Sequence, residues 1–542
     1  MKRKDFFQAV GGSLGATVPV FLSCGTGGDQ ARSPKPGHLP HSARPNIVII
    51  MADDMGYSDI GCYGGEIETP NLDSLASGGI RFSQFYNAAR CCPTRASLLT
   101  GLYPHQAGMG DMVSHDSKRK QGPYQGYLND RCVTIAEVLG SAGYNTYMSG
   151  KWHVGNAPEN WPRQRGFDRY FGPITGGNSY FEELKKRNRV IALDDTRWTP
   201  PDEGFYITDA ISDHAVEFID QQYEQEGQEK PFFMYMAYTA PHWPLHALPG
   251  DIKKYLGKYM EGWDVLRQRR YERMIELGLI DPAWPLSPRD SEVPPWEGIE
   301  DKKHWDRLMA VYAAMIDRMD QGIGRVLAKL REHGAYENTL VLFLSDNGGC
   351  HENLHWLEHL KLNQEGTLPG ERGSFTAYCR PWANFSNTPF RLFKHWVHEG
   401  GNSTPLIAHW PAGIGQAGAI THQPGHIIDL MATAIELADT RYPAEHNGKQ
   451  VTPPEGKSLV PIFSGQTRQE HSEIYWEHEG NRAVRQGRWK LVSADDGQWE
   501  LYDLVADRTE LNNLAEKNPA KLAELIEKYK AWAAKCGVKP YS

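Results

Sequence analysis

Two pairs of oxygen-bearing side chains stand out because each pair directly follows an apolar, β-branched run. Asp53 and Asp54 follow residues 46–51, and Asp346 with Asn347 follows residues 339–345. The carboxyl ends of parallel strands meet at one edge of a sheet, where open α/β proteins form their sites. Each pair alone would also suit a turn. Together they predict a site for a hard cation, Ca²⁺ or Mg²⁺, whereas zinc prefers histidine or cysteine ligands.

A second reactive segment is Cys91-Cys92-Pro93-Thr94-Arg95, followed by Ala-Ser-Leu-Leu-Thr-Gly101. Proline is favoured at the start of a helix and glycine just past its end, so we predict a helix of about two turns with Cys91 just before it. Free N–H groups at a helix N-terminus and the charge of Arg95 suit an anion. Cys91 is therefore a candidate nucleophile, and a buried cysteine pair beside an ordinary helix is the alternative.

Four more candidates could act on an anion, and three of them follow predicted strands. Lys151 and His153 follow residues 144–149, and His242 follows residues 232–238. Lys394 precedes Glu399-Gly400-Gly401. Singly, each of these side chains is typical of a solvated surface. Grouped around one anion with Arg95, they would supply positive charge and proton transfer.

The elements that must position these residues alternate between buried strands and amphipathic helices. This pattern predicts an α/β fold with a central, mostly parallel sheet flanked by helices. After residue 465 the pattern changes to short alternating strands and a last helix near residues 519–535. That change predicts a smaller C-terminal α+β domain with an antiparallel sheet. We place the catalytic α/β domain at residues 45–464, with a helical insertion at 250–300, and the C-terminal subdomain at 465–542.

The N-terminus has the pattern of an export signal. Lys2, Arg3 and Lys4 precede an apolar stretch that is too short and too glycine-rich for a comfortable membrane span. Residues 1–24 resemble either a twin-arginine signal or a lipoprotein signal with a lipid anchor at Cys24. Residues 25–44, rich in Gly, Ser and Pro, predict a flexible linker. We expect an exported protein, located in the periplasm or held as a lipoprotein at the outer membrane or cell surface.

Composition narrows the function. The 542 residues carry a net charge of −9, which argues against a nucleic-acid binder but allows an anionic small substrate. The eight cysteines lack the spacing of a structural zinc site. A Cys350–Cys379 disulfide would be compatible with an oxidising compartment.

Six separated motifs, in this order, resemble the type I, formylglycine-dependent sulfatase family of the alkaline phosphatase superfamily. They are Ala52-Asp53-Asp54-Met55-Gly56-Tyr57, the Cys91 segment, Gly150-Lys151-Trp152-His153, Ala240-Pro241-His242-Trp243-Pro244, Ser345-Asp346-Asn347-Gly348-Gly349, and Lys394 with Glu399-Gly400-Gly401. The resemblance runs from about Arg44 to the C-terminus. It implies an alkaline-phosphatase-like α/β domain and an arylsulfatase-like hydrolase that acts on an aryl sulfate or a sulfated carbohydrate.

The resemblance also implies roles for individual residues. Cys91 would be oxidised to formylglycine by a maturation machinery, and its hydrate would be the nucleophile. One Ca²⁺ per chain would be held by Asp53, Asp54, Asp346, Asn347 and the modified residue 91. Arg95 would steady the hydrate, and Lys151 and Lys394 would hold sulfate oxygens. His242, with Lys394, would protonate the leaving oxygen, and His153 would take a proton from the second hydroxyl.

Other interpretations stay open at this point. His351-Glu352-Asn353-Leu354-His355 matches the His-Glu-x-x-His pattern of zinc proteases, although it follows a turn. A phosphonate or phosphate ester hydrolase on the same scaffold is one alternative, and an exported glycan-binding protein without activity is another. For the leaving-group pocket, we expect walls from the 250–300 insertion and the 352–381 loop, including Trp263, Arg267, Trp296, Trp356 and Arg372.

Overall fold

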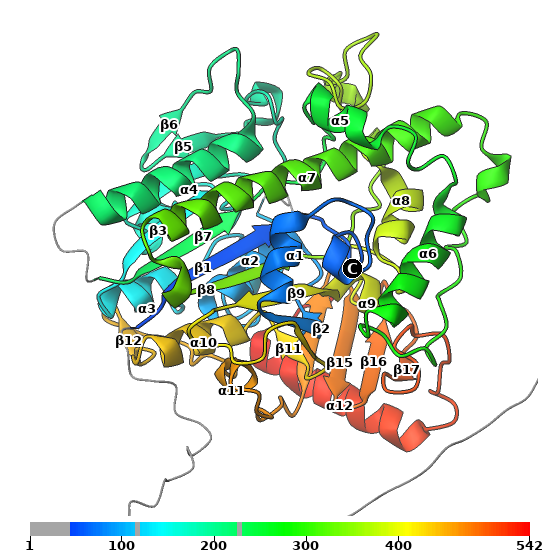
Figure 1. Ribbon diagram of the computed structural model, residues 1–542. Helices are drawn as coiled ribbons and strands as arrows, with labels where there is room; N and C mark the ends of the chain where they lie inside the picture. The colour runs from blue at the N-terminus through cyan, green and yellow to red at the C-terminus, as the bar shows by residue number, and fades with distance from the viewer. Residues whose placement is uncertain (1–43, 114–119, 225–229, 542) are drawn as a thin grey trace, which may run out of the picture. The chain divides into compact units, whose positions relative to one another are not determined.

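The computed structural model describes residues 44–113, 120–224 and 230–541. The predicted export signal and the lipid anchor at Cys24 lie outside these ranges, as does nearly all of the predicted linker. An eleven-stranded sheet runs through the larger part of the described chain (Figure 1). Its strands are β1 (Asn46–Ala52), β2 (Ile80–Tyr86), β3 (Asn145–Gly150), β4 (Arg169–Pro173), β5 (Ile191–Leu193), β6 (Thr196–Trp198), β7 (Phe232–Ala237), β8 (Thr339–Ser345), β9 (Ser403–His409), β10 (Ala419–Thr421) and β11 (Gly425–His426).

The centre of the sheet is parallel, as predicted. Strand β1 pairs in parallel with both β7 and β8, and β3 pairs in parallel with β7 and β4. All seven residues of β1 and of β8 are buried, which explains their continuous apolar sequences. Because Ala52 is paired with Ser345, the residues that follow these two strands emerge side by side at one edge.

Strand β9 interrupts the parallel order, which the sequence pattern does not reveal. It lies between β2 and β8 and is antiparallel to both. The short helix α9 (Glu399–Asn402) ends directly before β9 begins at Ser403. The chain therefore enters β9 from the edge where Asp53 and Asp346 lie and runs away from it. A strand parallel to β8 would need a crossover connection that returns the chain to the opposite edge of the sheet. The chain makes no such crossover before β9, so β9 is antiparallel.

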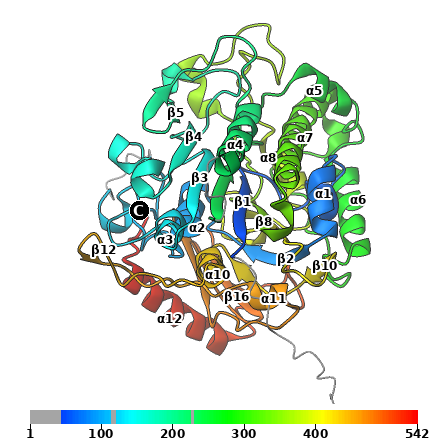
Figure 2. The same ribbon diagram turned by 60° about the vertical axis from the view of Figure 1, so that its left-hand side comes forward.

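Two groups of helices pack on this sheet. In the first group, α4 and α7 run side by side in both views, and α5 and α1 contact α7 (Figure 1, Figure 2). In the second, α2, α3 and α10 contact one another. The helices are α1 (Pro70–Ser77), α2 (Cys91–Thr100), α3 (Ile135–Ser141), α4 (Ile207–Glu224), α5 (Pro249–Tyr255), α6 (Trp263–Glu276), α7 (Lys302–Glu332), α8 (Cys379–Ser386), α10 (Asp429–Leu437), α11 (Val460–Phe463) and α12 (Pro519–Cys536). Within the described ranges, no helix is long and apolar enough to span a membrane.

The predicted C-terminal antiparallel sheet is present. Its four strands follow one another in chain order, and α12 packs on β15 and β16 (Figure 1). The strands are β14 (Ile474–His478), β15 (Asn481–Gln486), β16 (Trp489–Ser493) and β17 (Glu500–Asp503). Two minor strands, β12 (Glu445–His446) and β13 (Lys449–Gln450), form a separate hairpin.

The 250–300 insertion is partly helical, but its aromatic residues do not line a pocket. Trp263 and Trp296 are buried, and both rings pack against Trp382 of α8. Arg267 is also buried and donates a 3.0 Å hydrogen bond to the carbonyl of Ser287. The prediction that these three side chains line the leaving-group pocket is wrong. They are buried instead and form the local core of this otherwise polar segment. Trp356, in contrast, is 57% exposed.

Candidate active site

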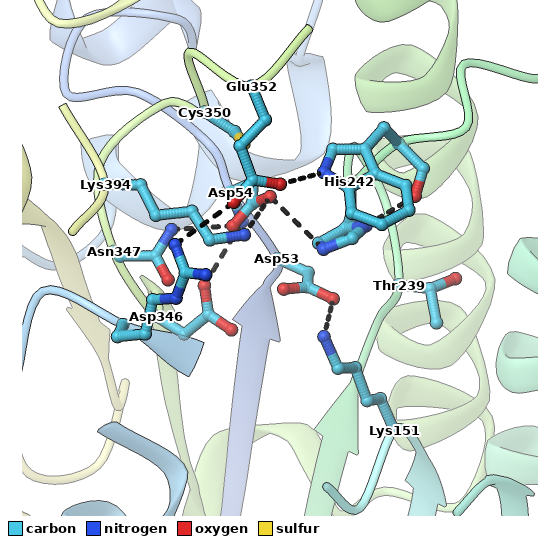
Figure 3. A network of polar contacts seen from close by, with 12 residues as sticks. Asp53, Asp54, Lys151, Thr239, His242, Asp346, Asn347, Cys350, Glu352 and Lys394 are labelled. Atoms are coloured by element: carbon cyan, nitrogen blue, oxygen red, sulfur yellow. Dashed lines mark hydrogen bonds and ion pairs between the residues drawn. The ribbon is translucent and has the colours of Figure 1, made fainter. Parts of the chain in front are cut away.

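Four oxygen-bearing side chains converge beyond β1 and β8 (Figure 3). The Asp54 backbone N–H donates to Asp346 Oδ1 at 3.2 Å, and Asn347 Nδ2 donates to Asp54 Oδ1 at 2.7 Å. Asp54 has a φ of 68°, a left-handed conformation that aspartate tolerates better than most residues. The two pairs that the sequence places after separate strands are thus joined into one cluster with Asp53.

This cluster has the chemistry of a hard-cation site. Asp53 Oδ1 and Asn347 Oδ1 are buried and accept no hydrogen bond within the described part of the chain. A buried oxygen without a donor is costly unless another electropositive group occupies its lone pairs. Burial, reinforced by Asp53, raises the pKa of Asp346 well above its usual range. A cation held between these oxygens would relieve both penalties, so the residues fit the predicted Ca²⁺.

Three buried cations surround the same carboxylates. Arg95 Nη2 lies 2.7 Å from Asp346 Oδ2, Lys151 Nζ lies 2.6 Å from Asp53 Oδ2, and Lys394 Nζ lies 2.7 Å from Asp54 Oδ2. Burial alone would raise the pKa of Asp53, but Lys151, His242 and Arg95 together hold it below its usual range. The three predicted anion-binding side chains therefore lie beside the predicted metal ligands.

The position of Lys151 depends on the glycine before it. Gly150 has a φ of 127°, and a Cβ atom there would lie 2.0 Å from the carbonyl oxygen of Ala237. Only glycine allows this approach. The Lys151 N–H donates to the same oxygen at 2.7 Å, which fixes the chain as it leaves β3.

Cys91 is the first residue of α2, with Arg90 as the N-cap. The helix has ten residues and ends at Gly101 in a left-handed conformation, so it begins one residue earlier and is longer than predicted. The Cys91 thiol is buried with Cys92 and His153. Hydrogen bonding from Cys92, aided by Lys151 and His153, lowers the pKa of Cys91 well below its usual range. Burial lowers the pKa of His153 to about 4, so the ring is neutral at pH 7.

His242 lies beside the carboxylates of Asp53 and Asp54. Its Nε2 is 3.4 Å from Asp54 Oδ2, and its Nδ1 bonds to the carbonyl of Trp243. The two rings lie 4.6 Å apart between centroids. Trp243 Nε1 in turn donates to Glu352 Oε2 at 2.7 Å, and Arg90 pairs with the same carboxylate at 3.2 Å. Glu352 is therefore part of the site, which Figure 3 shows above Asp54.

The His-Glu-x-x-His segment does not form a zinc-protease helix. His351 stacks on Phe393, whereas His355 is exposed in a 3₁₀ turn, 355–360, and bonds to Glu358 at 2.6 Å. The two histidines consequently do not share a helical face. Cys350 and Cys379 are free thiols, so the Cys350–Cys379 disulfide is absent from the structure.

The family model described as Sulfatase matches residues 45–440. The chain belongs to the sulfatase family. A second model, described as N-sulphoglucosamine sulphohydrolase, C-terminal, matches residues 390–534 of the sulfatase. The match covers the α/β part and the small C-terminal sheet, and it makes the protein a sulfuric ester hydrolase.

Individual relatives agree with this assignment. The sulfatase is 37% identical to an uncharacterized sulfatase of Schizosaccharomyces pombe over 92% of this chain and 95% of the relative. It is 36% identical to an arylsulfatase of Klebsiella aerogenes over 81% of this chain and 96% of that enzyme. A solved structure of Ps i-CgsB in complex with k-i-k-neocarrahexaose matches with a TM-score of 0.65 at 26% identity, covering 90% of this chain and 93% of that one. The non-catalytic interpretation is thereby set aside.

Every catalytic and metal-binding residue predicted from the sequence lies in this one region of the sulfatase. The sequence does not reveal the hydrogen-bonded residues around His242, namely Glu352 and Arg90. The sequence places Glu352 in a protease-like motif and at the start of the predicted 352–381 pocket loop, without a specific role, and Arg90 carries no signal that singles it out. The one available signal was the position of Glu352, shortly after the Asp346-Asn347 turn.

Proposed function

We propose that this sulfatase hydrolyses an aryl sulfate or a sulfated carbohydrate with formylglycine at position 91 and one bound Ca²⁺. The observation that supports it best is the location of the Cys91 thiol. It lies at the N-terminus of α2, in the field of Asp53, Asp346, Arg95 and Lys394. Formylglycine hydrate supplies a nucleophilic hydroxyl and a second hydroxyl whose loss of a proton expels sulfate.

The cation would be held by Asp53, Asp54, Asp346, Asn347 and the oxygen of the modified residue 91. When bound, Ca²⁺ supplies positive charge that lowers the pKa of a coordinated hydroxyl and stabilises charge on sulfate oxygens. An oxygen ligand at position 91 suits such a cation better than the encoded sulfur.

The remaining residues would bind the sulfate and move protons. Lys151 and Lys394 would bind sulfate oxygens; their ammonium groups lie beside the cluster, within 2.7 Å of its carboxylates. His242, with Lys394, would protonate the leaving oxygen. His153 is kept neutral by burial, which suits a base that takes a proton from residue 91. Arg95, fixed by Asp346 and the carbonyl of Lys151, would steady the hydrate.

The proposal extends to maturation and location. We infer an exported protein, periplasmic or attached through a lipid at Cys24, whose Cys91 is converted by a formylglycine-generating machinery. The sequence of residues 1–24 supports export. The aldehyde can be detected because it lowers the mass of the Cys91 tryptic peptide by the thiol-to-aldehyde difference.

The test combines modification and turnover. Protein with confirmed aldehyde and added Ca²⁺ is assayed with 4-nitrophenyl sulfate, sulfated oligosaccharides, and matched phosphate and phosphonate esters. We expect sulfate release, and no activity in Cys91→Ala. Full activity in unmodified protein would contradict the formylglycine mechanism, and faster turnover of phosphonates than of sulfates would favour the alternative hydrolase.

A further inference from the structure

Two arginines next to the active site form no ion pair with any residue that the structure describes. Arg187 ends the 3₁₀ segment Lys185–Arg187, and Arg189 lies two residues further on. Arg187 Nη1 and Arg189 Nε are buried without a hydrogen-bond partner. Across the described residues, no side chain forms a hydrogen bond or an ion pair with either guanidinium. Both residues are partly buried. A guanidinium group with a buried, unpaired nitrogen is costly, and such groups concentrate where a ligand supplies the missing charge.

The turn that carries these arginines is tightly built. The N–H groups of Arg187 and Arg189 both donate to the carbonyl of Leu184, at 2.9 and 3.3 Å. Asn188 between them has a φ of 50°, a conformation that asparagine tolerates well. These hydrogen bonds fix the backbone that carries both guanidinium groups. Their position near the site is therefore set by the turn.

The turn is tied to the catalytic edge through one residue, Ile174. The Ile174 N–H donates to the carbonyl of Val190 at 2.9 Å, and the Ile174 carbonyl accepts from the N–H of His153 at 3.0 Å. Arg189 thus precedes Val190, which is linked to His153 by two successive hydrogen bonds through Ile174. Burial lowers the pKa of Arg189 to about 10, and the nearby thiols of Cys92 and Cys91 act against that decrease.

Arg187 lies on the side of the site where His242 stands. Its guanidinium carbon is 5.0 Å from the Trp243 ring centroid and 5.8 Å from that of Trp356. Trp243 packs against His242, and Trp356 is largely exposed. Burial, with repulsion from Arg189, lowers the pKa of Arg187 to about 9, so it stays charged at neutral pH. Glu352 attracts Arg187 and opposes this decrease, but its carboxylate is bonded to Trp243 and Arg90 and forms no ion pair with Arg187.

We propose that Arg187 and Arg189 bind a second anionic group, a carboxylate or a further sulfate, on the leaving group of the sulfate ester. The inference rests on the proposed function, because it takes the leaving group to lie on the His242 side. Guanidinium groups bind both anions through paired hydrogen bonds. The exposed face of Trp356 offers an apolar surface for the ring that carries the anion. The preferred substrates are therefore esters with at least two negative charges.

The experiment measures kcat/KM on matched aryl sulfates with the aldehyde-containing, Ca²⁺-loaded protein. The singly charged ester is 3-(methoxycarbonyl)phenyl sulfate. The doubly charged esters are 3-carboxyphenyl sulfate and 1,3-phenylene bis-sulfate. Comparing these two substrates identifies whether a carboxylate or a second sulfate is preferred. The variants are Arg187→Met, Arg189→Met and the double variant, in which methionine keeps an unbranched apolar stem. Lys185→Met is the control, since Lys185 is an exposed cation of the same turn.

We expect the wild type to prefer at least one doubly charged ester. The double variant should lose about 10- to 100-fold on that ester and less than about twofold on the singly charged one, while Lys185→Met changes neither. Arg187→Lys should restore part of the loss. The proposal is overturned if the wild type has no preference for either doubly charged ester, or if the double variant loses the same factor on all three. Absence of turnover on every ester would instead contradict the proposed function.

Discussion

Lys490 Nζ lies 2.8 Å from Glu399 Oε1, and both side chains are fully buried. Lys490 belongs to β16 of the C-terminal sheet, whereas Glu399 begins α9, five residues after Lys394. The same ammonium lies 2.9 Å from Glu510 Oε1, and Arg508 Nε lies 3.0 Å from Glu399 Oε2. The C-terminal sheet is thus joined to the segment of Lys394 by charges that water does not reach.

The first prediction concerns this connection. Lys490→Met should lower the free energy of unfolding by about 3–5 kcal/mol, because it leaves two buried carboxylates without their shared cation. The denaturant midpoint measures the loss. Lys530→Met is the control, since Lys530 is exposed and pairs only with Glu527 three residues earlier. Equal midpoints for the two variants would show that the buried cluster contributes little to stability.

The second prediction concerns stability against pH at His246. This buried ring bonds through Nε2 to the carbonyl of Ser374 at 2.7 Å, and its Nδ1 accepts from the Tyr180 N–H at 3.3 Å. Burial lowers its pKa to about 4. Below about pH 6.5 the unfolded chain binds a proton that the folded chain does not, so stability falls as pH falls through 6.5 toward 4.

Between pH 7 and pH 5 this group should cost the wild type roughly 2 kcal/mol of unfolding free energy. His246→Gln removes the titrating ring and should reduce the fall by that amount, whatever its effect at pH 7. Urea denaturation at the two pH values measures the difference. The same fall in wild type and variant would place the pH sensitivity elsewhere.

The third prediction tests the oxygen cluster. Ca²⁺ should raise the unfolding temperature of the protein, because a ligand that binds only the folded state stabilises it. Asn347→Ala removes one of the two buried oxygens that lack a donor, and it should weaken Ca²⁺ binding by roughly 10-fold or more. Calorimetric titration with Ca²⁺ measures the affinity. Asp195→Ala, at an exposed ion pair, should bind Ca²⁺ as the wild type does, and equal affinity in Asn347→Ala would rule out the cluster as the site.

The fourth prediction concerns proton donation by His242. His242→Asn should lose roughly 10²- to 10⁴-fold in kcat on sulfate esters with poor leaving groups, such as alkyl or sugar sulfates. The loss on 4-nitrophenyl sulfate should be much smaller, because nitrophenolate leaves without protonation. A plot of rate against leaving-group pKa for both proteins gives the comparison, with exposed His355→Asn as the control. Parallel lines for His242→Asn and the wild type would mean that His242 does not protonate the leaving oxygen.

The centre of the site was predictable because its signals are local. An apolar run predicts a buried strand, and Asp53 or Asp346 marks the residue where that strand ends. Because the strands are parallel, their carboxyl ends lie at the same edge of the sheet. The direction of β9 was not predictable in this way. It depends on α9, which ends directly before the strand and returns the chain from the catalytic edge.

Features set by tertiary contacts were missed or misjudged. Trp263 and Trp296 lie in a charged segment, which suggested a pocket, yet each ring packs on Trp382 from a distant part of the chain. Arg187 and Arg189 belong to a run of basic residues that resembles a solvated loop. Only the structure reveals that each guanidinium has a buried nitrogen and no ion-pair partner among the described residues.

The burial of Cys91 imposes an order in time. The residue is 2% exposed, and its thiol interacts with the charges of Lys151 and Lys394. An oxidising enzyme cannot reach a thiol that is buried in this way, so the conversion proposed here would have to precede folding of the surrounding chain. The buried ion pairs of Lys490 with Glu399 and Glu510 can form only when the last quarter of the chain is available. Under the proposed mechanism, Cys91 would be accessible only for a limited interval after synthesis, and a protein that folds before conversion would lack its nucleophile.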